Sequence, residues 1–273
     1  MPNLVSSAIR QGLYTHVVGR RILYRPVLDS TMDEAARLAE EGSEEGAVVI
    51  AERQSAGRGR QGRSWVSQPG NLLLSILFRP GMSQLPFISV IGGVAAARAI
   101  RKAAGLAPRV KWPNDVILDG RKVAGILTES AIVGDSVCYA VLGLGINVAL
   151  NPADSEEIAA LHPELAERAI SINAAAGREV DRGLLLRQLL LDLDDLYVSL
   201  SRGASPLPEW RELLETTGRR VDATFGGDTF TGLAEGVDDT GNLLLRLDDG
   251  TVMTLTAGDV TLSGAAKQLN PRS

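Results

Sequence analysis

The sequence predicts an α+β protein with two structured parts, residues 1–217 and 218–264, followed by a tail over residues 265–273. Three observations lead to this prediction. A chain of 273 residues exceeds the usual size of one domain, about 100–200 residues. Helical and strand-like segments are interspersed in the first part. From Gly218 to Leu262 the sequence shows only short alternating strands separated by glycine-containing turns, which indicates a small β-barrel.

The first helix is expected to begin at Ser30 or Thr31, either of which can act as its N-cap. Asp33 or Glu34 is expected to return a hydrogen bond to the cap, as in a capping box. An apolar face of alanines and one leucine follows, and Gly42 marks the end of the helix.

Hydrophobic periodicity and turn residues place the other elements of the first part. Strands are expected at Ala47–Glu52, Asn71–Phe78 and Ser136–Val148, helices at Pro86–Gly105, Arg182–Arg202 and Pro206–Leu214, and the arms of a hairpin at Arg109–Leu118 and Lys122–Ser130. The hairpin is expected to turn at Asp119-Gly120. In the helix over 182–202 a leucine stripe is expected to face the core, and Asp192, Asp194 and Asp195 to face water.

Composition argues against several classes of protein. A net charge of −5 is unlike that of a general nucleic-acid-binding protein. The one cysteine, Cys138, excludes an internal disulfide, indicates a reducing compartment and is expected to be buried. His16 and His162 are far apart, which argues against a zinc site or a histidine triad. Because no apolar stretch is long enough to span a bilayer, we expect a cytoplasmic protein with no membrane partner.

A loop rich in glycine and arginine is the first candidate for chemistry. It contains Arg53, and then Gly57-Arg58-Gly59-Arg60-Gln61-Gly62-Arg63. Glycines let backbone N–H groups approach an anion and keep a segment mobile, while arginines are permanently charged donors for phosphate or carboxylate. Trp65 follows and could stack on a planar base. A solvated surface loop and an RNA-binding tract are the alternative interpretations.

A second candidate is the segment Lys111-Trp112-Pro113-Asn114-Asp115. Proline fixes the backbone between an aromatic residue and two polar residues, which favours a rigid turn that holds Asn114 and Asp115 toward a pocket. The alternative is a structural turn in which these side chains bond to their own backbone.

Two further candidates lie on the predicted strands. Lys122 begins a strand of small and apolar residues, and it is one of four lysines against 24 arginines. Because Lys111 lies on the other arm of the same hairpin, the two predict a shared electropositive site; a surface lysine is the alternative. Gly143 and Gly145 alternate along a strand and leave one face bare for a ligand or for close strand packing. A P-loop and a complete dinucleotide-binding turn are absent from the sequence.

In order and spacing these motifs resemble the biotin–protein ligase (biotin–[acetyl-CoA-carboxylase] ligase) family. The resemblance extends over residues 29–148 and includes the C-terminal β-module. It is carried by Asp29-Ser30-Thr31, Gln54, Gly57-Arg58-Gly59-Arg60-x-Gly62-Arg63-x-Trp65, Lys111-Trp112-Pro113-Asn114-Asp115, Arg121-Lys122-x-Ala124-Gly125-Ile126-Leu127 and Gly143-x-Gly145-Ile146-Asn147. It implies a mixed-sheet catalytic domain, shared in outline with lipoate ligases, and an SH3-like C-terminal barrel.

The resemblance implies a two-step reaction. The carboxylate of biotin attacks the α-phosphate of ATP and gives biotinyl-5′-AMP and pyrophosphate, and a lysine of a biotin carboxyl carrier protein then takes the acyl group. The first step brings two anions together, so fixed positive charge must offset their repulsion. Lys122, Arg58 and Mg²⁺ are expected to supply it. The glycine–arginine loop is expected to close over the ligands and shield the mixed anhydride from water.

The resemblance also assigns roles to individual residues. Lys122, Arg58 and Asp115 would be catalytic, and Asp115 would also hold Mg²⁺. The residues that would bind biotin are Ser30, Thr31, Gln54, Gly57, Arg58, Arg60, Lys122, Gly125, Gly143 and Gly145. Those that would bind ATP are Arg58, Arg60, Trp65, Lys111, Asn114 and Asn147.

Two departures refine this expectation. Met32 stands where many members of the family carry a polar asparagine, which puts that one contact in doubt. The Asp-Ser-Thr motif begins at residue 29, so we expect the form of the family that lacks the N-terminal DNA-binding domain, with no DNA partner. Family members are often dimers, and a homodimer is a further expectation. A lipoate–protein ligase and a non-catalytic nucleic-acid-binding module are the alternative functions.

Overall fold

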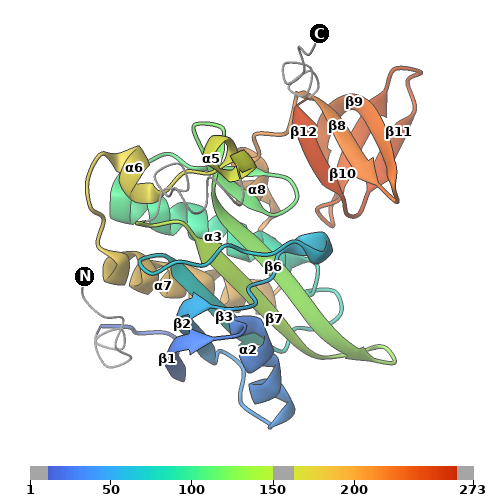
Figure 1. The fold of residues 1–273 in the computed structure, drawn as a ribbon. Coiled ribbons are helices and arrows are strands. Elements are labelled where there is room, and N and C mark those ends of the chain that lie inside the picture. Colours follow the sequence, from blue (N-terminus) through green and yellow to red (C-terminus); the bar gives the residue numbers. More distant parts are fainter. Residues whose placement is uncertain (1–11, 150–162, 263–273) are drawn as a thin grey trace.

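The computed structural model describes residues 12–149 and 163–262. They form a seven-stranded sheet covered by helices and a separate five-stranded sheet toward the C-terminus, as Figure 1 shows. The seven strands are β1 (Ile22–Leu28), β2 (Val48–Gln54), β3 (Leu72–Phe78), β4 (Arg109–Lys111), β5 (Asp115–Leu118), β6 (Arg121–Val133) and β7 (Ser136–Ile146). Their order is β1-β2-β3-β7-β6-β5-β4, and only the β1–β2 pair is parallel. The mixed sheet predicted for the first part is thereby confirmed.

The two faces of this sheet bury different elements. Two helices, α3 (Phe87–Ala104) and α7 (Arg182–Ser201), pack together against one face, where alternate strand residues such as Leu74, Leu142 and Leu144 join the main core. The opposite face packs against α2 (Thr31–Glu40). Since side chains alternate along a strand, the intervening positions face α2. This second face is only partly covered by helix, which leaves room for a site.

The helix α2 begins as the sequence predicts. The Oγ atom of Ser30 accepts from the backbone N–H groups of Met32 and Asp33, at 3.2 and 3.4 Å. The expected capping box is wrong, because both acidic side chains are taken by arginines. Asp33 pairs with Arg58 and Glu34 pairs with Arg37.

The predicted hairpin over residues 109–130 is a three-stranded unit. Lys111 is the register partner of Asp115, so β4 and β5 fold back on each other around Trp112, Pro113 and Asn114. The first arm is therefore split into two strands, and the rigid turn predicted at this motif is confirmed. The second turn falls at Asp119-Gly120, where both residues have positive φ, as expected.

Helix α7 confirms the predicted range but not the predicted exposure of its acidic residues. Asp192 and Asp194 are 5% and 4% exposed. The Asp194 carboxylate accepts three backbone N–H groups of residues 16–18 at 2.7–2.8 Å, and Asp192 pairs with Lys102. Only Asp195 faces water, with 70% of its side chain exposed. The buried carboxylates are tolerated because their oxygens accept hydrogen bonds, those of Asp194 from residues 16–18 and those of Asp192 from Lys102 and from Gln188 on the same helix.

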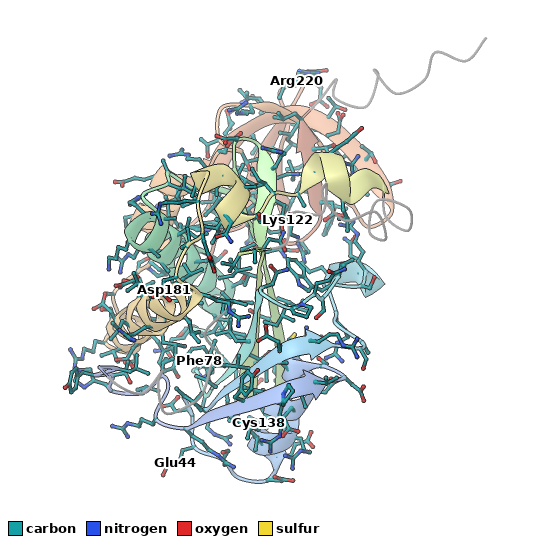
Figure 2. All side chains as sticks on the ribbon, turned by 60° about the vertical axis from the view of Figure 1, so that its left-hand side comes forward. Glu44, Phe78, Lys122, Cys138, Asp181 and Arg220 are labelled. Atoms are coloured by element: carbon teal, nitrogen blue, oxygen red, sulfur yellow. The ribbon has the colours of Figure 1, made fainter. Side chains whose placement is uncertain are left out.

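Cys138 is exposed, so the prediction that it is buried is wrong. It lies on β7 close to the turn of the long β6–β7 hairpin, which extends beyond the helices. Figure 2 places Cys138 and Lys122 at opposite ends of this hairpin. An apolar stretch of sequence here forms an edge of the molecule rather than its centre.

The C-terminal module is an antiparallel sheet with the order β11-β10-β9-β8-β12. Its strands are β8 (Arg220–Phe225), β9 (Asp228–Val237), β10 (Leu243–Leu247), β11 (Val252–Leu255) and β12 (Asp259–Leu262). The all-β character predicted for this region is confirmed, and Figure 1 shows the sheet curving at one end of the molecule. Trp112 Nε1 donates to Gly241 O at 3.0 Å and so joins the module to the β4–β5 turn.

Three short α-helices and one 3-10 turn complete the described chain: α5 (Pro163–Arg168), α6 (Ile172–Ala176), α8 (Leu207–Leu213), the last within the predicted range, and η1 (Arg60–Gly62) in the glycine–arginine loop. His162 and the predicted tail over residues 265–273 lie outside the described residues. Within 12–149 and 163–262, no helix combines the length and apolarity needed to cross a membrane.

The buried Asp194 carboxylate is expected to be a major contributor to stability. Asp194→Ala would leave three backbone N–H groups without their acceptor and is expected to lower the free energy of unfolding by about 3 kcal/mol. Urea denaturation measures this difference. Asp195→Ala, on the same helix but exposed, is the matched control and should change it by less than about 0.5 kcal/mol. Equal effects of the two variants would contradict the account.

Candidate active site

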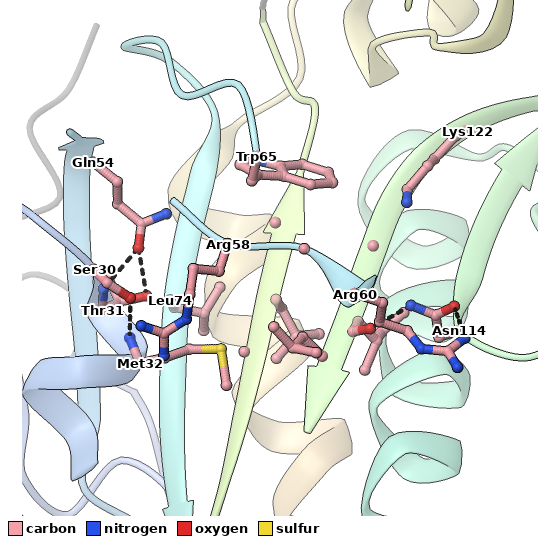
Figure 3. A pocket seen from close by; sticks show the side chains of 17 residues that line it. Ser30, Thr31, Met32, Gln54, Arg58, Arg60, Trp65, Leu74, Asn114 and Lys122 are labelled. Atoms are coloured by element: carbon pink, nitrogen blue, oxygen red, sulfur yellow. Dashed lines mark hydrogen bonds between the residues drawn. The ribbon is translucent and has the colours of Figure 1, made fainter. Parts of the chain in front are cut away.

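A cavity lies on the α2 side of the seven-stranded sheet. It opens between the start of α2, the glycine–arginine loop and strands β6 and β7, as Figure 3 shows. Its lining residues are Ser30, Thr31, Met32, Gln54, Arg58, Gly59, Arg60, Trp65, Leu74, Asn114, Lys122, Gly125, Ile126, Leu127, Gly143, Leu144 and Gly145. Its lining combines apolar side chains with a few polar and charged groups, as in sites for small organic ligands.

The floor of the cavity is a patch of bare backbone. Gly125 on β6 is the register partner of Gly145 on β7, and Gly143 lies two residues away on the same face. A Cβ atom added to Gly145 would lie 2.4 Å from the Trp65 ring, and one added to Gly143 would lie 2.8 Å from the Met32 sulfur. The glycines are therefore required for these two side chains to lie flat on the sheet. The bare strand face predicted from the sequence is confirmed, but Trp65 and Met32 cover part of it.

Lys122 reaches the same floor because the alternation of β6 is broken. Val123 and Ala124 both point into the main core, and the β5–β6 register shifts at this place. A bulge of this kind redirects a side chain. The Lys122 ammonium consequently lies 2.7 Å from Asp115 Oδ1 and 5.5 Å from the centre of the Trp65 ring. One carboxylate and one aromatic face hold the cation at the edge of the cavity.

At the opposite end of the cavity lies a cluster of polar groups. Gln54 Oε1 accepts from the backbone N–H of Thr31 at 2.7 Å and from the Thr31 hydroxyl at 2.9 Å. The Thr31 hydroxyl also lies 2.8 Å from Ser75 Oγ. Ser30 uses its oxygen lone pairs for the helix cap, so its hydroxyl proton is available to a ligand. The cavity thus has a polar end and a cationic end, separated by bare backbone.

Three arginines of the glycine–arginine loop bind carboxylates or polar atoms around the mouth of the cavity. Arg58 lies between Asp33 and Glu129, at 2.5 and 2.8 Å. These carboxylates outweigh the effect of burial and raise the pKa of Arg58, so it stays charged. As a result, the loop is connected by ion pairs to α2 and to β6.

The next two arginines connect the loop to other parts of the chain. Arg60 donates to Asn114 Oδ1 at 3.1 Å and to Gly258 O at 3.2 Å, and Arg63 pairs with Asp259. Burial lowers the pKa of Arg60, although Asp115 opposes this effect. Since Gly258 and Asp259 belong to the C-terminal module, the loop lies between that module and the cavity.

Most of the residues expected at the site from the sequence lie together. Eleven of them line the cavity, namely Ser30, Thr31, Gln54, Arg58, Arg60, Trp65, Asn114, Lys122, Gly125, Gly143 and Gly145. Asp115 lies behind Lys122, and Gly57 lies against Gln54 and the Trp65 backbone. Lys111 is close enough to Asp115 and Lys122 to feel their charges, and burial lowers its pKa. Asn147 is buried at the end of β7 and does not line the cavity.

Seven residues that build the site were assigned no role from the sequence, although Met32, Gly59, Ile126 and Leu127 stand in or beside its motifs. Six of them line the cavity: Met32, Gly59, Leu74, Ile126, Leu127 and Leu144. Four of these look like ordinary core residues of strands, so nothing in the sequence separates them from their neighbours. The seventh, Ser75, is the single polar residue in the strand LLLSILF, and that exception was the signal that could have identified it.

The donor set for a divalent cation is small. In the described part of the chain, no group of three or more His, Cys, Asp or Glu side chains could hold a metal ion. One carboxylate, that of Asp115, lies next to the cationic end of the cavity. This arrangement fits Mg²⁺, which binds to proteins through one or two carboxylates and takes its other ligands from phosphates and water.

Comparison with known proteins identifies the family. The model of the biotin/lipoate A/B protein ligase family matches residues 24–147, and that of the biotin protein ligase C-terminal domain matches residues 216–263. The bifunctional ligase/repressor BirA of Bacillus subtilis is 36% identical over 264 residues, which cover 95% of this chain and 79% of that protein. The chain belongs to the biotin–protein ligase family. The resemblance inferred from its motifs and the fold class inferred with it are therefore confirmed.

Other relatives and solved structures of biotin–protein ligases agree. The biotin–[acetyl-CoA-carboxylase] ligase of Paracoccus denitrificans is 35% identical, and the match covers 86% of this chain and 98% of that protein. A ligase from Aquifex aeolicus, solved in complex with biotin and ATP, superposes with a TM-score of 0.72 at 27% identity. This match covers 89% of this chain and 98% of that one.

Trp65 is expected to report on ligand binding. Its ring lies over Gly145 inside the cavity, and its Nε1 is buried without a partner among the described residues. The other two tryptophans, Trp112 and Trp210, are each 2% exposed and lie in the core. A ligand in the cavity should therefore change the intrinsic fluorescence through Trp65 alone.

Titration of the wild type and of Trp65→Phe with biotin and with ATP measures this. The wild-type signal should saturate, and the variant should lose most of the change while keeping its unfolding transition. A full-size signal in Trp65→Phe would show that another tryptophan reports and would contradict the position of Trp65.

Proposed function

We propose that this chain is an ATP-dependent biotin–protein ligase, which forms biotinyl-5′-AMP and transfers the biotinyl group to a lysine of a biotin carboxyl carrier protein. The observation that carries the proposal is the polarity of the cavity. It has a hydrogen-bonding end at Thr31 and Gln54, a bare apolar floor, and a cationic end at Lys122. Biotin has the same three parts in the same order: a ureido head, an apolar body and a carboxylate.

At the polar end, Ser30, Thr31 and Gln54 bind the ureido head. The ring system and the side chain of biotin lie along Gly143, Gly145 and the side chain of Leu127. The glycines bring the ligand against the sheet because no Cβ atom keeps it away. Gly57 lies against Gln54 and supports the same end of the site.

The first step takes place at the cationic end. A carboxylate oxygen of biotin attacks the α-phosphorus of ATP, a new P–O bond forms, and the bond to the β-phosphate oxygen breaks with release of pyrophosphate. Repulsion between the two anions opposes their approach, and Lys122, Arg58 and Arg60 are the nearest cations of the site. Fixed donors of this kind stabilise the charge that develops on the phosphate oxygens, while the binding of both ligands supplies alignment.

The nucleotide is assigned to the side of the site nearest the C-terminal module. Trp65 offers a flat face for the base or ribose, and Asn114 and Lys111 lie on the turn next to Asp115. Asn147 lies deeper, so its role in ATP binding would be to support the strand end. Mg²⁺, when bound with the nucleotide, would neutralise phosphate charge next to the carboxylate of Asp115. The glycine–arginine loop limits the access of water to the acyl-adenylate.

In the second step the amine of the carrier lysine attacks the acyl carbon of biotinyl-5′-AMP, loses a proton and expels AMP. Asp115 is the carboxylate closest to Lys122 and is the candidate to hold the incoming ammonium or receive its proton. The carrier domain is the protein partner that this reaction requires. A homodimer and the absence of a DNA partner stay predictions.

We also propose a domain division at residue 217, with residues 1–217 binding biotin and ATP and residues 218–264 forming the C-terminal domain. The contacts of Arg60 and Arg63 with Gly258 and Asp259 support a role for the second domain in holding the loop. These contacts cross the proposed boundary and end at the mouth of the cavity.

Exchange of radiolabelled pyrophosphate into ATP tests the proposed reaction. Biotin-dependent exchange is the expected result; exchange that requires lipoate would support a lipoate ligase, and no exchange with either acid would support a non-catalytic binding module. Lys122→Ala should reduce biotin-dependent exchange by about 10²–10³-fold, because it removes a charge used at the transition state.

Lys102→Ala is the matched control for the lysine variant. Lys102 forms a salt bridge with Asp192 on the helical side of the molecule, away from the cavity, so its removal should leave exchange close to the wild-type rate. If Lys122→Ala folds normally and exchanges pyrophosphate at nearly the wild-type rate, the catalytic role proposed for Lys122 is wrong.

A further inference from the structure

Ser75 is a buried hydroxyl that does not line the cavity. It lies at the centre of β3, is 0% exposed and is the register partner of Gly143. Its one hydrogen-bond partner among the described residues is the Thr31 hydroxyl, at 2.8 Å. A polar side chain placed at the centre of an apolar strand has to be satisfied there, and this one is satisfied by a residue that does line the cavity.

We infer that Ser75 is a positioning residue that orients the Gln54 amide through Thr31, and so makes the polar end of the site specific for a hydrogen-bond acceptor. The inference rests on the proposed function, because it names the group of biotin that this end selects.

The backbone N–H of Thr31 fixes the orientation of the Gln54 amide. A backbone N–H can only donate, and that of Thr31 lies 2.7 Å from Gln54 Oε1. The oxygen must therefore face Thr31, and the amide nitrogen must face elsewhere. In Figure 3 the nitrogen of Gln54 points away from Thr31, on the side of the cavity below Trp65.

The Gln54 carbonyl oxygen in turn fixes the direction in which the two hydroxyl groups donate. Gln54 Oε1 also lies 2.9 Å from the Thr31 hydroxyl, and since a carbonyl oxygen cannot donate, Thr31 must donate to it. Thr31 has then used its one proton, so the 2.8 Å contact with Ser75 requires Ser75 to donate to Thr31. The protons thus run in one direction, from Ser75 to Thr31 to Gln54.

This chain of hydrogen bonds determines which ligand group the polar end accepts. Two donors on Oε1 make a flip of the Gln54 amide costly, and a chain of hydrogen bonds in one direction polarises its members and strengthens the terminal N–H donor. Ser30 also offers a hydroxyl proton at this end. The polar end therefore presents donors, which match a carbonyl oxygen and repel an N–H group in the same place.

Ser75→Ala removes the donor to the Thr31 hydroxyl, and with it the polarisation that strengthens the donation of Thr31 to Gln54 Oε1. The Thr31 hydroxyl is then free to turn away from Gln54, so the Gln54 amide is held by the backbone N–H of Thr31 alone and the polar end selects its ligand group less strictly. If Ser75 served only in packing, Ser75→Ala would lower the affinity for every ligand by the same factor. The ratio of affinities for two ligands that differ only at the head separates these roles.

The experiment compares biotin with 2-iminobiotin, in which a protonated guanidinium group, a donor that carries positive charge at neutral pH, replaces the ureido carbonyl acceptor. Dissociation constants are measured by calorimetry for the wild type and Ser75→Ala, with desthiobiotin, which keeps the ureido group, as a third ligand. Ser75→Ala should reduce the preference for biotin over 2-iminobiotin by about fivefold. Its affinities for biotin and desthiobiotin should fall in parallel, with kcat for pyrophosphate exchange nearly unchanged.

Two further variants serve as controls. Ser75→Cys retains a weak donor and should give a preference between those of the wild type and Ser75→Ala. Thr128→Val removes another buried hydroxyl of the same sheet, one with no partner among the described residues, and should leave the preference unchanged.

An unchanged preference in Ser75→Ala, or an equal fall for all three ligands, would overturn the inference while leaving the proposed function intact. A wild type that does not bind biotin would overturn the proposed function itself.

Discussion

The site depends on the absence of side chains from one small area of the sheet. Gly125 and Gly145 are paired across β6 and β7, and the space above them is filled by the Trp65 ring and the Lys122 side chain. With a Cβ atom at either position, the ring could not lie where it does, and the ammonium would lose its aromatic partner. The other parts of the site are arranged around this contact.

The two faces of the sheet divide structure from function. Strand residues on the α3 and α7 side form the main core, which fixes the spacing of the strands. The other side is covered only in part by α2, and the glycine–arginine loop completes the cover by ion pairs instead of apolar packing. Exposed ion pairs contribute little to stability, so the loop can be rearranged at low cost when charged ligands enter.

Much of this arrangement could be predicted from the sequence because the functional residues occur in local motifs. The helix after Ser30, the turn at Pro113 and the alternating glycines each have a local physical cause, and the structure places them as expected. Expectations that depended on long-range contacts were wrong: Asp33 and Asp194 have partners about 25 and 177 residues away, and periodicity carries no information about such partners. Ser75 stands out in the sequence as the one polar residue of its strand, but its partner Thr31 lies on another element, so its role could not be read from the strand alone.

The bare backbone at Gly145 allows Trp65 and Lys122 to occupy their places. The most direct test is pyrophosphate exchange by Gly145→Ala, with Gly93→Ala as the control, because a Cβ atom at Gly93 would have its nearest neighbour 3.8 Å away. Gly145→Ala is expected to fold but to lose most biotin-dependent exchange, while Gly93→Ala is expected to retain it. Full exchange activity in a folded Gly145→Ala protein would contradict the account.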